Sequence, residues 1–453
     1  MAVERFDVVV IGAGFAGITA ARELSHRGHS VLVVEARDRV GGRTWLDDRL
    51  GHRLEIGGTW VHWIQPHVWA EMARYDIGVV PGPTPIRAHW LADGQRHTGT
   101  PDQLTALIDK GMTLSTADAL TYFPRPYEPL AGPDLESIDM LSMRERIAAL
   151  GLTAVETDLV DGMWSTNFNA RTEHGAYTQG LHWCALSAGS WPLMFEACAT
   201  FKLAGGTARL LAAMLDDAAV EVRLDTLVTH VRQDDAGAVV TTANGKEIGA
   251  GAVVVTAPLN VLGTIDFEPP LSQTKRSAAT QGQASSGLKA WARLRGEYDP
   301  FVALAPGYAP LTLAQVDRVG DGETIVVLFG PDAAALDGNE REAVQAALRQ
   351  WLPDAEVIEA ASHDWVSDPL SGETWPMLRP GQLTGALAEL QRPEGRIILA
   401  GSDYASGWRG FIDGAIESGL RAAHLVHSPS GEQSRASVSG AWDVREPSTS
   451  VSV

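Results

Sequence analysis

The stretch "FDVVVIGAGFAG", Phe6 to Gly17, indicates how the fold begins. Its first half, 6–11, is a continuous apolar run of the kind found in strands that are buried on both faces. Residues 18–27 then repeat apolar side chains at helical spacing, and Gly28 is a suitable helix stop. A second apolar run, "SVLVVEARD" at 30–38, completes a strand–helix–strand unit. We therefore expect an α/β fold built on a buried sheet.

The glycines of this stretch have the GxGxxG spacing of a dinucleotide-binding turn. Gly12 allows the tight turn, Gly14 lets the backbone approach a pyrophosphate at the positive end of the helix, and Gly17 allows close helix packing. Glu35, at the end of the second strand, can accept hydrogen bonds from a ribose 2′-hydroxyl. An acidic residue there favours an adenosine ribose without a 2′-phosphate. The motif alone does not separate NAD from FAD.

Composition narrows the class of protein. A chain of 453 residues predicts at least two domains, and its formal net charge of -20 argues against nucleic acid or an anionic membrane surface as a partner. The chain starts without an export-signal pattern and has no apolar run long enough to cross a membrane, so we expect a cytoplasmic protein. Cys184 and Cys198 are expected to be free thiols. No metal-ligand cluster stands out.

The chain divides into interleaved segments. Strand patterns with turn signals dominate residues 1–80, 205–285 and 390–427, and we expect these three segments to assemble one Rossmann-like, dinucleotide-binding domain. Helical patterns separated by proline clusters fill 81–204, and strands with one helix at 337–351 fill 286–389. These two segments are expected to form an interleaved α+β substrate domain. The Ser-rich end, 428–453, lacks periodicity and is predicted to be a disordered tail.

Later motifs resemble the flavin-containing amine oxidase (monoamine oxidase) family. "RVGGRT" at 39–44 resembles its second fingerprint for FAD, and "EIGGTWVHW" at 55–63 resembles the segment beneath the flavin ring. "SSGLKAW" at 285–291 resembles the segment that bears a lysine near flavin N5, and 399–423 resembles the C-terminal FAD signature. The resemblance covers roughly residues 5–427. Within the family it is nearest in look to bacterial amine oxidases of nicotine and pseudooxynicotine breakdown.

The resemblance implies FAD as cofactor. The residues it implies for FAD binding are Gly12, Gly14, Phe15, Ala16, Gly17, Glu35, Ala36, Arg37, Gly42, Arg43, Gly58, Thr59, Trp60, Val228, Trp365, Gly401, Ser402, Asp403, Phe411, Ile412 and Ala415. In the monoamine oxidases a cysteine bonded to the flavin stands where this chain has Thr374 in "SGETWP". We therefore expect non-covalent FAD.

The resemblance also implies three catalytic residues. Trp375 and Phe411 match the two walls of an aromatic cage that holds a neutral amine over flavin N5. The alternative is that both rings are ordinary core aromatics. Lys289 matches the lysine that holds a water against N5 and aids reoxidation of the reduced flavin. The expected reaction is oxidation of a small, fairly apolar amine, with O₂ reduced to hydrogen peroxide.

Other functions stay open at this point. An L-amino-acid oxidase would need an arginine to clamp the substrate carboxylate, and Arg409 is the candidate. An amine dehydrogenase would pass its electrons to a redox protein, and a flavin-binding protein without turnover is the third alternative. The sequence also leaves open the identity of the amine, its enantiomer and whether the protein is a homodimer.

Overall fold

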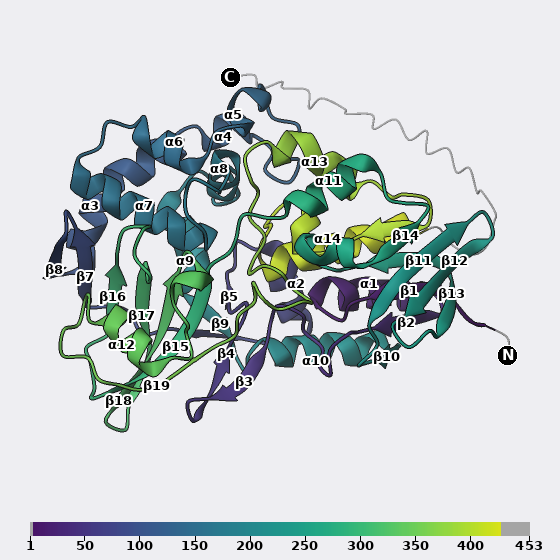
Figure 1. Ribbon diagram of the computed structural model, residues 1–453, viewed down its shortest axis with the longest axis horizontal. Helices are drawn as coiled ribbons and strands as arrows, with labels where there is room; N and C mark the ends of the chain where they lie inside the picture. The colour runs from purple at the N-terminus through teal and green to yellow at the C-terminus, as the bar shows by residue number, and fades with distance from the viewer. Residues whose placement is uncertain (1–2, 427–453) are drawn as a thin grey trace, which may run out of the picture.

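The computed structural model describes residues 3–426 and consists of two lobes lying side by side (Figure 1). An eight-stranded sheet forms the core of the first lobe. Its order is β10 (Glu221–Arg223), β2 (Val31–Val34), β1 (Glu4–Ile11), β13 (Glu247–Val255), β12 (Gly237–Thr242), β11 (Val228–Asp234) and β14 (Asp266–Glu268), and β20 (Ile397–Leu399) also pairs with β13. The strands β10, β2, β1, β13 and β20 run parallel, so their carboxyl ends meet at one edge.

Strand β1 is buried on both faces, as its apolar run predicts. Val8 and Val10 pack against one helical layer, whereas Val9 and Ile11 pack against the other. The first layer contains α1 (Phe15–His26), α2 (Pro66–Arg74), α10 (Thr207–Ala218) and α14 (Ile412–Leu425). The second contains η1 (Leu259–Thr264), α11 (Gln273–Gln281) and α13 (Gln382–Gln391). Successive side chains of a strand point to opposite faces of the sheet, so alternate residues of β1 contact alternate helical layers.

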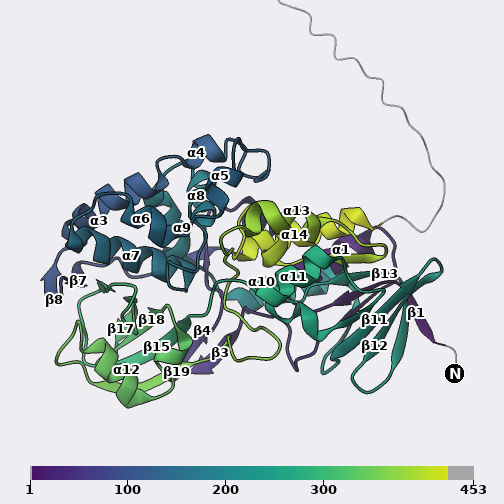
Figure 2. The ribbon, with the colours of Figure 1, turned by 45° about the horizontal axis from the view of Figure 1, so that its top comes forward.

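A seven-stranded sheet forms the second lobe. Its order is β19 (Val357–Ser362), β15 (Leu288–Arg295), β18 (Glu323–Gly330), β17 (Leu313–Gly320), β16 (Phe301–Leu304), β7 (Arg87–Ala92) and β8 (Gln95–Gly99). A layer of helices packs against its β7 and β16 side (Figure 2). These are α3 (Pro101–Thr116), α4 (Ala119–Tyr122), α5 (Glu136–Asp139), α6 (Met143–Ala148), α7 (Ala154–Phe168), α8 (Tyr177–Leu186) and α9 (Trp191–Ala199).

Short strands lie between the two lobes. The hairpin of β3 (Leu46–Arg49) and β4 (His52–Glu55) packs through Leu50 and Leu54 onto the second lobe's sheet. A small three-stranded sheet joins β5 (Trp60–Val61), β9 (Phe201–Leu203) and β6 (Val79–Pro81). The assignment of sequence segments to two domains stays a prediction.

One sequence expectation is corrected in detail. The helix expected at 337–351 is shorter, because Asp337 accepts a bond from the backbone of Asn339 and makes a turn, so that α12 spans Arg341–Leu348. Within the segment 205–285, β10 and β11 are separated by residues that include Asp225, whose φ is 49°. Within residues 3–426, no helix combines the length and apolarity that crossing a membrane requires. The tail predicted at 428–453 lies outside the described residues.

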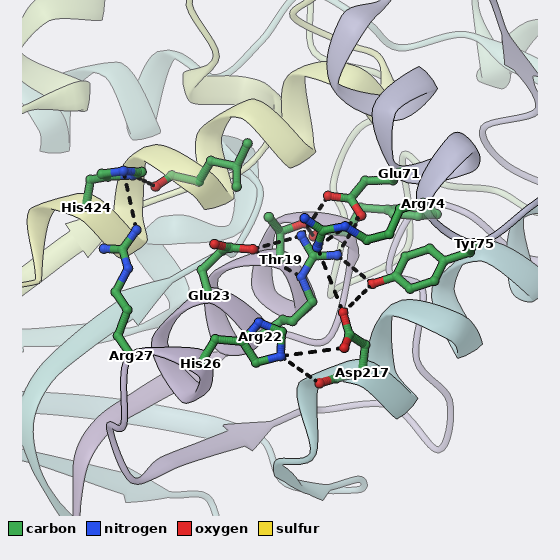
Figure 3. A network of polar contacts seen from close by, with 12 residues as sticks. Thr19, Arg22, Glu23, His26, Arg27, Glu71, Arg74, Tyr75, Asp217 and His424 are labelled. Atoms are coloured by element: carbon green, nitrogen blue, oxygen red, sulfur yellow. Dashed lines mark hydrogen bonds and ion pairs between the residues drawn. The ribbon is translucent and has the colours of Figure 1, made fainter.

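A buried arginine joins three helices of the first lobe (Figure 3). Arg22 of α1 is fully buried and donates from both terminal nitrogens to the carboxylate of Glu71 on α2, at 2.6 Å each. It also donates to the hydroxyl of Tyr75, which donates in turn to Asp217 of α10. Because the guanidinium is out of contact with water, its charge depends on Glu71 for compensation.

Replacing Glu71 by Ala should therefore destabilise the first lobe strongly. The change leaves the Arg22 charge buried without its bidentate partner, and we expect a loss of about 3–5 kcal/mol in the free energy of unfolding. Glu23 also bonds Arg22 but is partly exposed, so Glu23→Ala serves as the control and should lose no more than about 1 kcal/mol. Chemical denaturation of the two variants measures both values; equal losses would contradict the assignment.

Candidate active site

A cleft opens where the carboxyl ends of the parallel strands meet. Gly12 follows β1, Glu35 follows β2, Thr256 follows β13 and Gly401 follows β20, and all four line the cleft. Ligands bind in this position in open α/β sheets, because the strand ends and the loops after them leave a crevice there. The parallel pairing of β1, β2, β13 and β20 therefore places the cleft.

The glycine motif has the geometry that its spacing predicts. Gly12 has φ +104°, and a Cβ there would lie 2.3 Å from Thr256 Oγ1. A Cβ on Gly17 would lie 2.0 Å from the Gly12 carbonyl oxygen, so this glycine permits close packing. At Gly14, by contrast, the nearest atom outside residues 13–15 is the Gly41 carbonyl oxygen, 3.8 Å from the ideal Cβ position, which is an ordinary contact distance. Gly14 therefore lies in the cleft lining beside Gly41 and Gly42, without the collision that a Cβ would make at Gly12 or Gly17.

The start of α1 is suited to an anion. Gly14 is its N-cap and supplies no side-chain cap, and the first turn contains no acidic residue. The first amide groups of a helix have no partner within the helix and carry its positive dipole end. Phe15 and Ala16 of this turn line the cleft. The cradle fits the pyrophosphate of a dinucleotide.

Glu35 is fixed at the end of β2. One oxygen of its carboxylate accepts from the backbone nitrogen of Ala13 at 2.8 Å, and the other accepts from that of Arg37 at 2.9 Å. Each carboxylate oxygen has a further lone pair. Glu35 is therefore fixed in the cleft with lone pairs left for a further donor, and its role with a ribose hydroxyl stays a prediction.

Arg43 ties three segments together at the wall of the cleft. Its guanidinium pairs with Glu373 and Asp403, and it donates to Ser402 Oγ and to the Thr374 carbonyl at 3.1 Å each. Ser402 and Thr374 also line the cleft. Burial works against the Arg43 charge, but the two acidic neighbours raise its pKa above the ordinary value.

Lys289 projects from β15 into the same cleft. Along this strand Ala290 and Ala292 pack toward α12, whereas Lys289 and Trp291 lie on the opposite face. Its Nζ lies 2.7 Å from the carbonyl oxygens of Glu55 and Gly57 and 2.5 Å from Thr59 Oγ1. Burial lowers the pKa of Lys289 to about 7, against the opposing effect of Glu55.

These three bonds bear on the role predicted for Lys289. An amine nitrogen has three positions besides its bond to carbon, whether it is charged or neutral. All three are engaged by residues 55–59, so a water on Nζ must replace or share one of them. The predicted water-holding role stays a prediction, and the structure adds that Lys289 secures the segment 55–59 against β15.

Trp375 and Phe411 both line the cleft. Trp375 donates from Nε1 to the Asn167 carbonyl at 2.8 Å and packs edge-on against Phe329, with ring centroids 6.1 Å apart. Phe411 packs edge-on against Trp183 and Trp408, at 5.2 and 5.1 Å. Each ring is thus supported by the protein while it borders the cleft, which disfavours the reading of both as ordinary core aromatics.

Most residues predicted to bind the cofactor lie around this one cleft. Those that line it are Gly12, Gly14, Phe15, Ala16, Glu35, Ala36, Arg37, Gly42, Arg43, Gly58, Val228, Trp365, Gly401, Ser402, Phe411, Ile412 and Ala415. Four others are absent from the lining among the described residues: Gly17, Thr59, Trp60 and Asp403. Gly17 packs on Gly12, Thr59 bonds Lys289, the Trp60 ring lies 5.1 Å from Lys289 Nζ, and Asp403 pairs with Arg43.

The sequence reasoning missed part of the lining. The missed residues include Thr44, Ile56, Gly57, Thr226, Leu227, Thr256, Ala257, Pro258, Val261, Thr264, Ile265, Pro369, Leu370, Ser371, Pro376 and Gly410. Some of them follow β13, whose strand pattern was recognisable in "GAVVVTAP". Its carboxyl end could have indicated them, because parallel strands end at the same edge.

Arg409 lies away from the cleft lining. It is fully buried, and its guanidinium donates to the Gln179 side chain and to the Ala405 carbonyl. It therefore does not reach the cleft as a carboxylate clamp. Among the described residues, no group of three or more His, Cys, Asp and Glu side chains could hold a metal ion.

Comparisons with known proteins agree with this geometry. A family model described as flavin containing amine oxidoreductase matches residues 15–427. A pseudooxynicotine dehydrogenase of a Pseudomonas species is 40% identical over 430 residues, covering 93% of this chain and 86% of the relative. A nicotine dehydrogenase of Pseudomonas putida is 36% identical, covering 93% and 88%. A solved putrescine oxidase variant shares the fold, with a TM-score of 0.83 at 24% identity, over 93% of this chain and 99% of that one.

Proposed function

Since the chain belongs to the family of flavin-containing amine oxidoreductases, we propose that it binds FAD non-covalently and oxidises a small, fairly apolar amine, aromatic or alicyclic. FAD would accept a hydride from the substrate α-carbon at N5 and then pass two electrons to O₂, which takes up protons to give hydrogen peroxide. The resulting imine is hydrolysed by water to an aldehyde or ketone and ammonia or a smaller amine. The names of the two Pseudomonas relatives make nicotine and pseudooxynicotine the first amines to test.

The charges that line the cleft are the observation that supports this proposal. The charged side chains among the lining residues are those of Glu35, Arg37, Arg43 and Lys289. Arg37 is paired with Asp368, Arg43 is paired with Glu373 and Asp403, and Glu35 is at the β2 end. A second ammonium group of a diamine would therefore meet no carboxylate beside Trp375 and Phe411 within the described lining. A substrate carboxylate would meet no unpaired arginine.

The protein's own contribution is to position a neutral amine. The Trp375 and Phe411 rings border the place where the substrate would lie, and the backbone around Gly410 lies close to Trp375 and Trp183. Aromatic faces attract an incoming ammonium, and an apolar slot favours the deprotonated form that can release a hydride. Correct placement of the α-carbon lowers the entropic part of the barrier.

Removing one cage ring tests this arrangement. Phe411→Leu keeps an apolar side chain but removes the ring, and we expect kcat/KM for an apolar monoamine, measured per bound FAD, to fall by about tenfold. Phe195→Leu is the matched control, because Phe195 packs on Trp191 and is not among the cleft-lining residues. Both variants are assayed with monoamines, a diamine and an amino acid. A preference for the diamine or the amino acid in the unchanged enzyme would contradict the proposed substrate class.

Acid treatment tests the absence of a covalent bond to the cofactor. Thr374 lines the cleft where a cysteine would be needed, whereas neither Cys184 nor Cys198 is among the lining residues. Precipitation with acid is therefore expected to release essentially all of the FAD into the supernatant, as absorbance of the two fractions will show. Yellow colour retained in the precipitated chain would contradict this prediction.

A second candidate is an amine dehydrogenase that passes electrons to a redox protein. Both Pseudomonas relatives are named as dehydrogenases, which favours this function. Reduced enzyme mixed with air distinguishes the two functions: an oxidase is reoxidised rapidly and forms stoichiometric hydrogen peroxide, whereas a dehydrogenase stays reduced until an electron-accepting protein is added.

A further inference from the structure

Behind the cleft wall, one arginine serves two buried carboxyl groups. Arg43 reaches Glu373 with one terminal nitrogen and Asp403 with the other. Glu373 is 0% exposed and Asp403 is 1% exposed. Because both nitrogens are attached to the same carbon, the two carboxyl groups are brought close to one another. Two carboxyl groups that are both shielded from water therefore share one guanidinium charge.

The hydrogen bonds of the two carboxyl groups differ. Asp403 accepts from the Leu259 backbone nitrogen at 2.9 Å through one oxygen and from Arg43 through the other. Glu373 accepts from Arg43 through Oε1, but no N–H or O–H group of residues 3–426 donates to its Oε2. A buried anionic oxygen without a donor is strongly unfavourable, whereas a protonated one can donate to the neighbouring carboxylate.

The electrostatic environment also favours a proton on Glu373 and not on Asp403. Burial, together with the neighbouring Asp403 charge, raises the pKa of Glu373 well above its ordinary value. Burial also acts against the charge of Asp403, but the Arg43 charge and a hydrogen bond with Glu373 lower the pKa of Asp403. Two close carboxyl groups commonly divide in this way, with one ionised and one neutral.

We propose that Glu373 is a neutral carboxylic acid that donates a hydrogen bond to ionised Asp403, and that it is a positioning residue for the cofactor cleft. Its effect on FAD rests on the function proposed above, whereas its protonation does not. Glu373 is followed in the chain by Thr374 and then by Trp375, the predicted cage residue. The Thr374 carbonyl also accepts a hydrogen bond from Arg43, and both Thr374 and Trp375 line the cleft. The neutral acid thus fastens the cage-bearing segment to the arginine of the FAD fingerprint without adding net charge.

Amide substitutions at the two positions test the assignment. Glu373→Gln preserves the size, the acceptor for Arg43 and a donor toward Asp403, so its FAD dissociation constant should stay within about threefold of the unchanged protein. Asp403→Asn is the matched control, because Asp403 pairs with the other terminal nitrogen of Arg43. On the present proposal Asp403 is ionised, so this variant removes a negative charge. We expect it to weaken FAD binding by about tenfold or more. Glu373→Leu, which has no polar atom, should weaken FAD binding and raise KM for the amine.

Infrared spectroscopy reads the proton directly, without any use of activity. The difference spectrum between the unchanged protein and Glu373→Gln at neutral pH should show the carbonyl absorption of a protonated carboxyl group. A carboxylate absorption in its place would overturn the proposal. This measurement does not depend on Asp403→Asn folding, and it can be made even if the protein binds no FAD, so its failure is distinct from failure of the proposed function.

Stability against pH provides a second readout. The charged or titratable groups that face Glu373 are Arg43 and Asp403, with the buried hydroxyl of Tyr404 beside them. At a pH between the ordinary and the raised pKa, Glu373 holds its proton in the folded state but loses it in the unfolded state. The free energy of unfolding therefore falls as the pH rises through this range. Glu373→Gln lacks this loss, so its melting temperature relative to that of the unchanged protein should increase as the pH rises above the ordinary carboxyl pKa. A difference that stays constant, or that favours the unchanged protein as pH rises, would contradict a neutral Glu373.

Discussion

Gly14→Val is expected to fold normally and to lose FAD. The nearest atom outside residues 13–15, the Gly41 carbonyl oxygen, lies 3.8 Å from the Cβ position at Gly14, and the backbone is extended there, with φ −80°. The Cβ of a valine therefore meets no clash with the protein, and we expect the valine methyl groups to fill the space in front of the α1 N-terminus that a pyrophosphate would occupy. We expect the FAD dissociation constant to rise by at least about a hundredfold, which is about 3 kcal/mol. Fluorescence titration with FAD measures it, and circular dichroism checks the fold.

Two other glycines serve as controls for that result. Gly78→Val should leave FAD binding unchanged, because no atom of the described part of the chain lies within 4 Å of its Cβ position. Gly17→Val should damage the fold itself, because its Cβ would collide with the Gly12 carbonyl. Retention of tight FAD binding in Gly14→Val would exclude this helix end as the pyrophosphate site.

Lys289→Met is expected to separate the two halves of the catalytic cycle. Methionine fills a similar volume but cannot donate to the Glu55 and Gly57 carbonyls or place an amine in the cleft. We expect anaerobic reduction by the amine to change by no more than a few-fold, and reoxidation by O₂ to slow by about a hundredfold. Stopped-flow absorbance measures the two steps separately.

Lys275→Met is the matched control for this variant. Lys275 is equally buried but bonds the Arg392 carbonyl and the Glu394 carboxylate and is not among the cleft-lining residues. Its replacement should lower stability without changing either half-reaction. If Lys289→Met slowed reduction as much as reoxidation, the lysine would be needed for placing the amine or the segment 55–59, and its role with oxygen would be rejected.

Much of the fold and of the candidate site could be predicted from the sequence, because short local patterns indicate the elements concerned. The run at 6–17 contains a strand, a turn that only glycine allows and a helix start, and the structure has all three. The resemblance to the flavin amine oxidases is confirmed by the family match over 15–427. The aromatic residues Trp375 and Phe411 do lie at one cleft, although they are 36 positions apart in the sequence.

What the sequence did not reveal depends on contacts between distant segments. Glu373 shows no local pattern, and its environment arises only when 43, 373 and 403 meet in the fold. Arg409 is two positions from Phe411, the predicted cage residue, yet its side chain bonds Gln179 of α8. The three partners of Lys289 lie more than two hundred residues earlier in the chain. Spacing within one segment cannot predict such partners.

Anaerobic titration of the purified protein with amines tests the central claim most directly. With nicotine, pseudooxynicotine and a panel of primary, secondary, aromatic and cyclic amines, we expect at least one apolar monoamine to bleach the flavin absorbance, and admission of air to show whether the colour returns with formation of hydrogen peroxide. Putrescine and L-amino acids should bleach it far more slowly. A bound flavin that no amine in the panel reduces would contradict the proposed function.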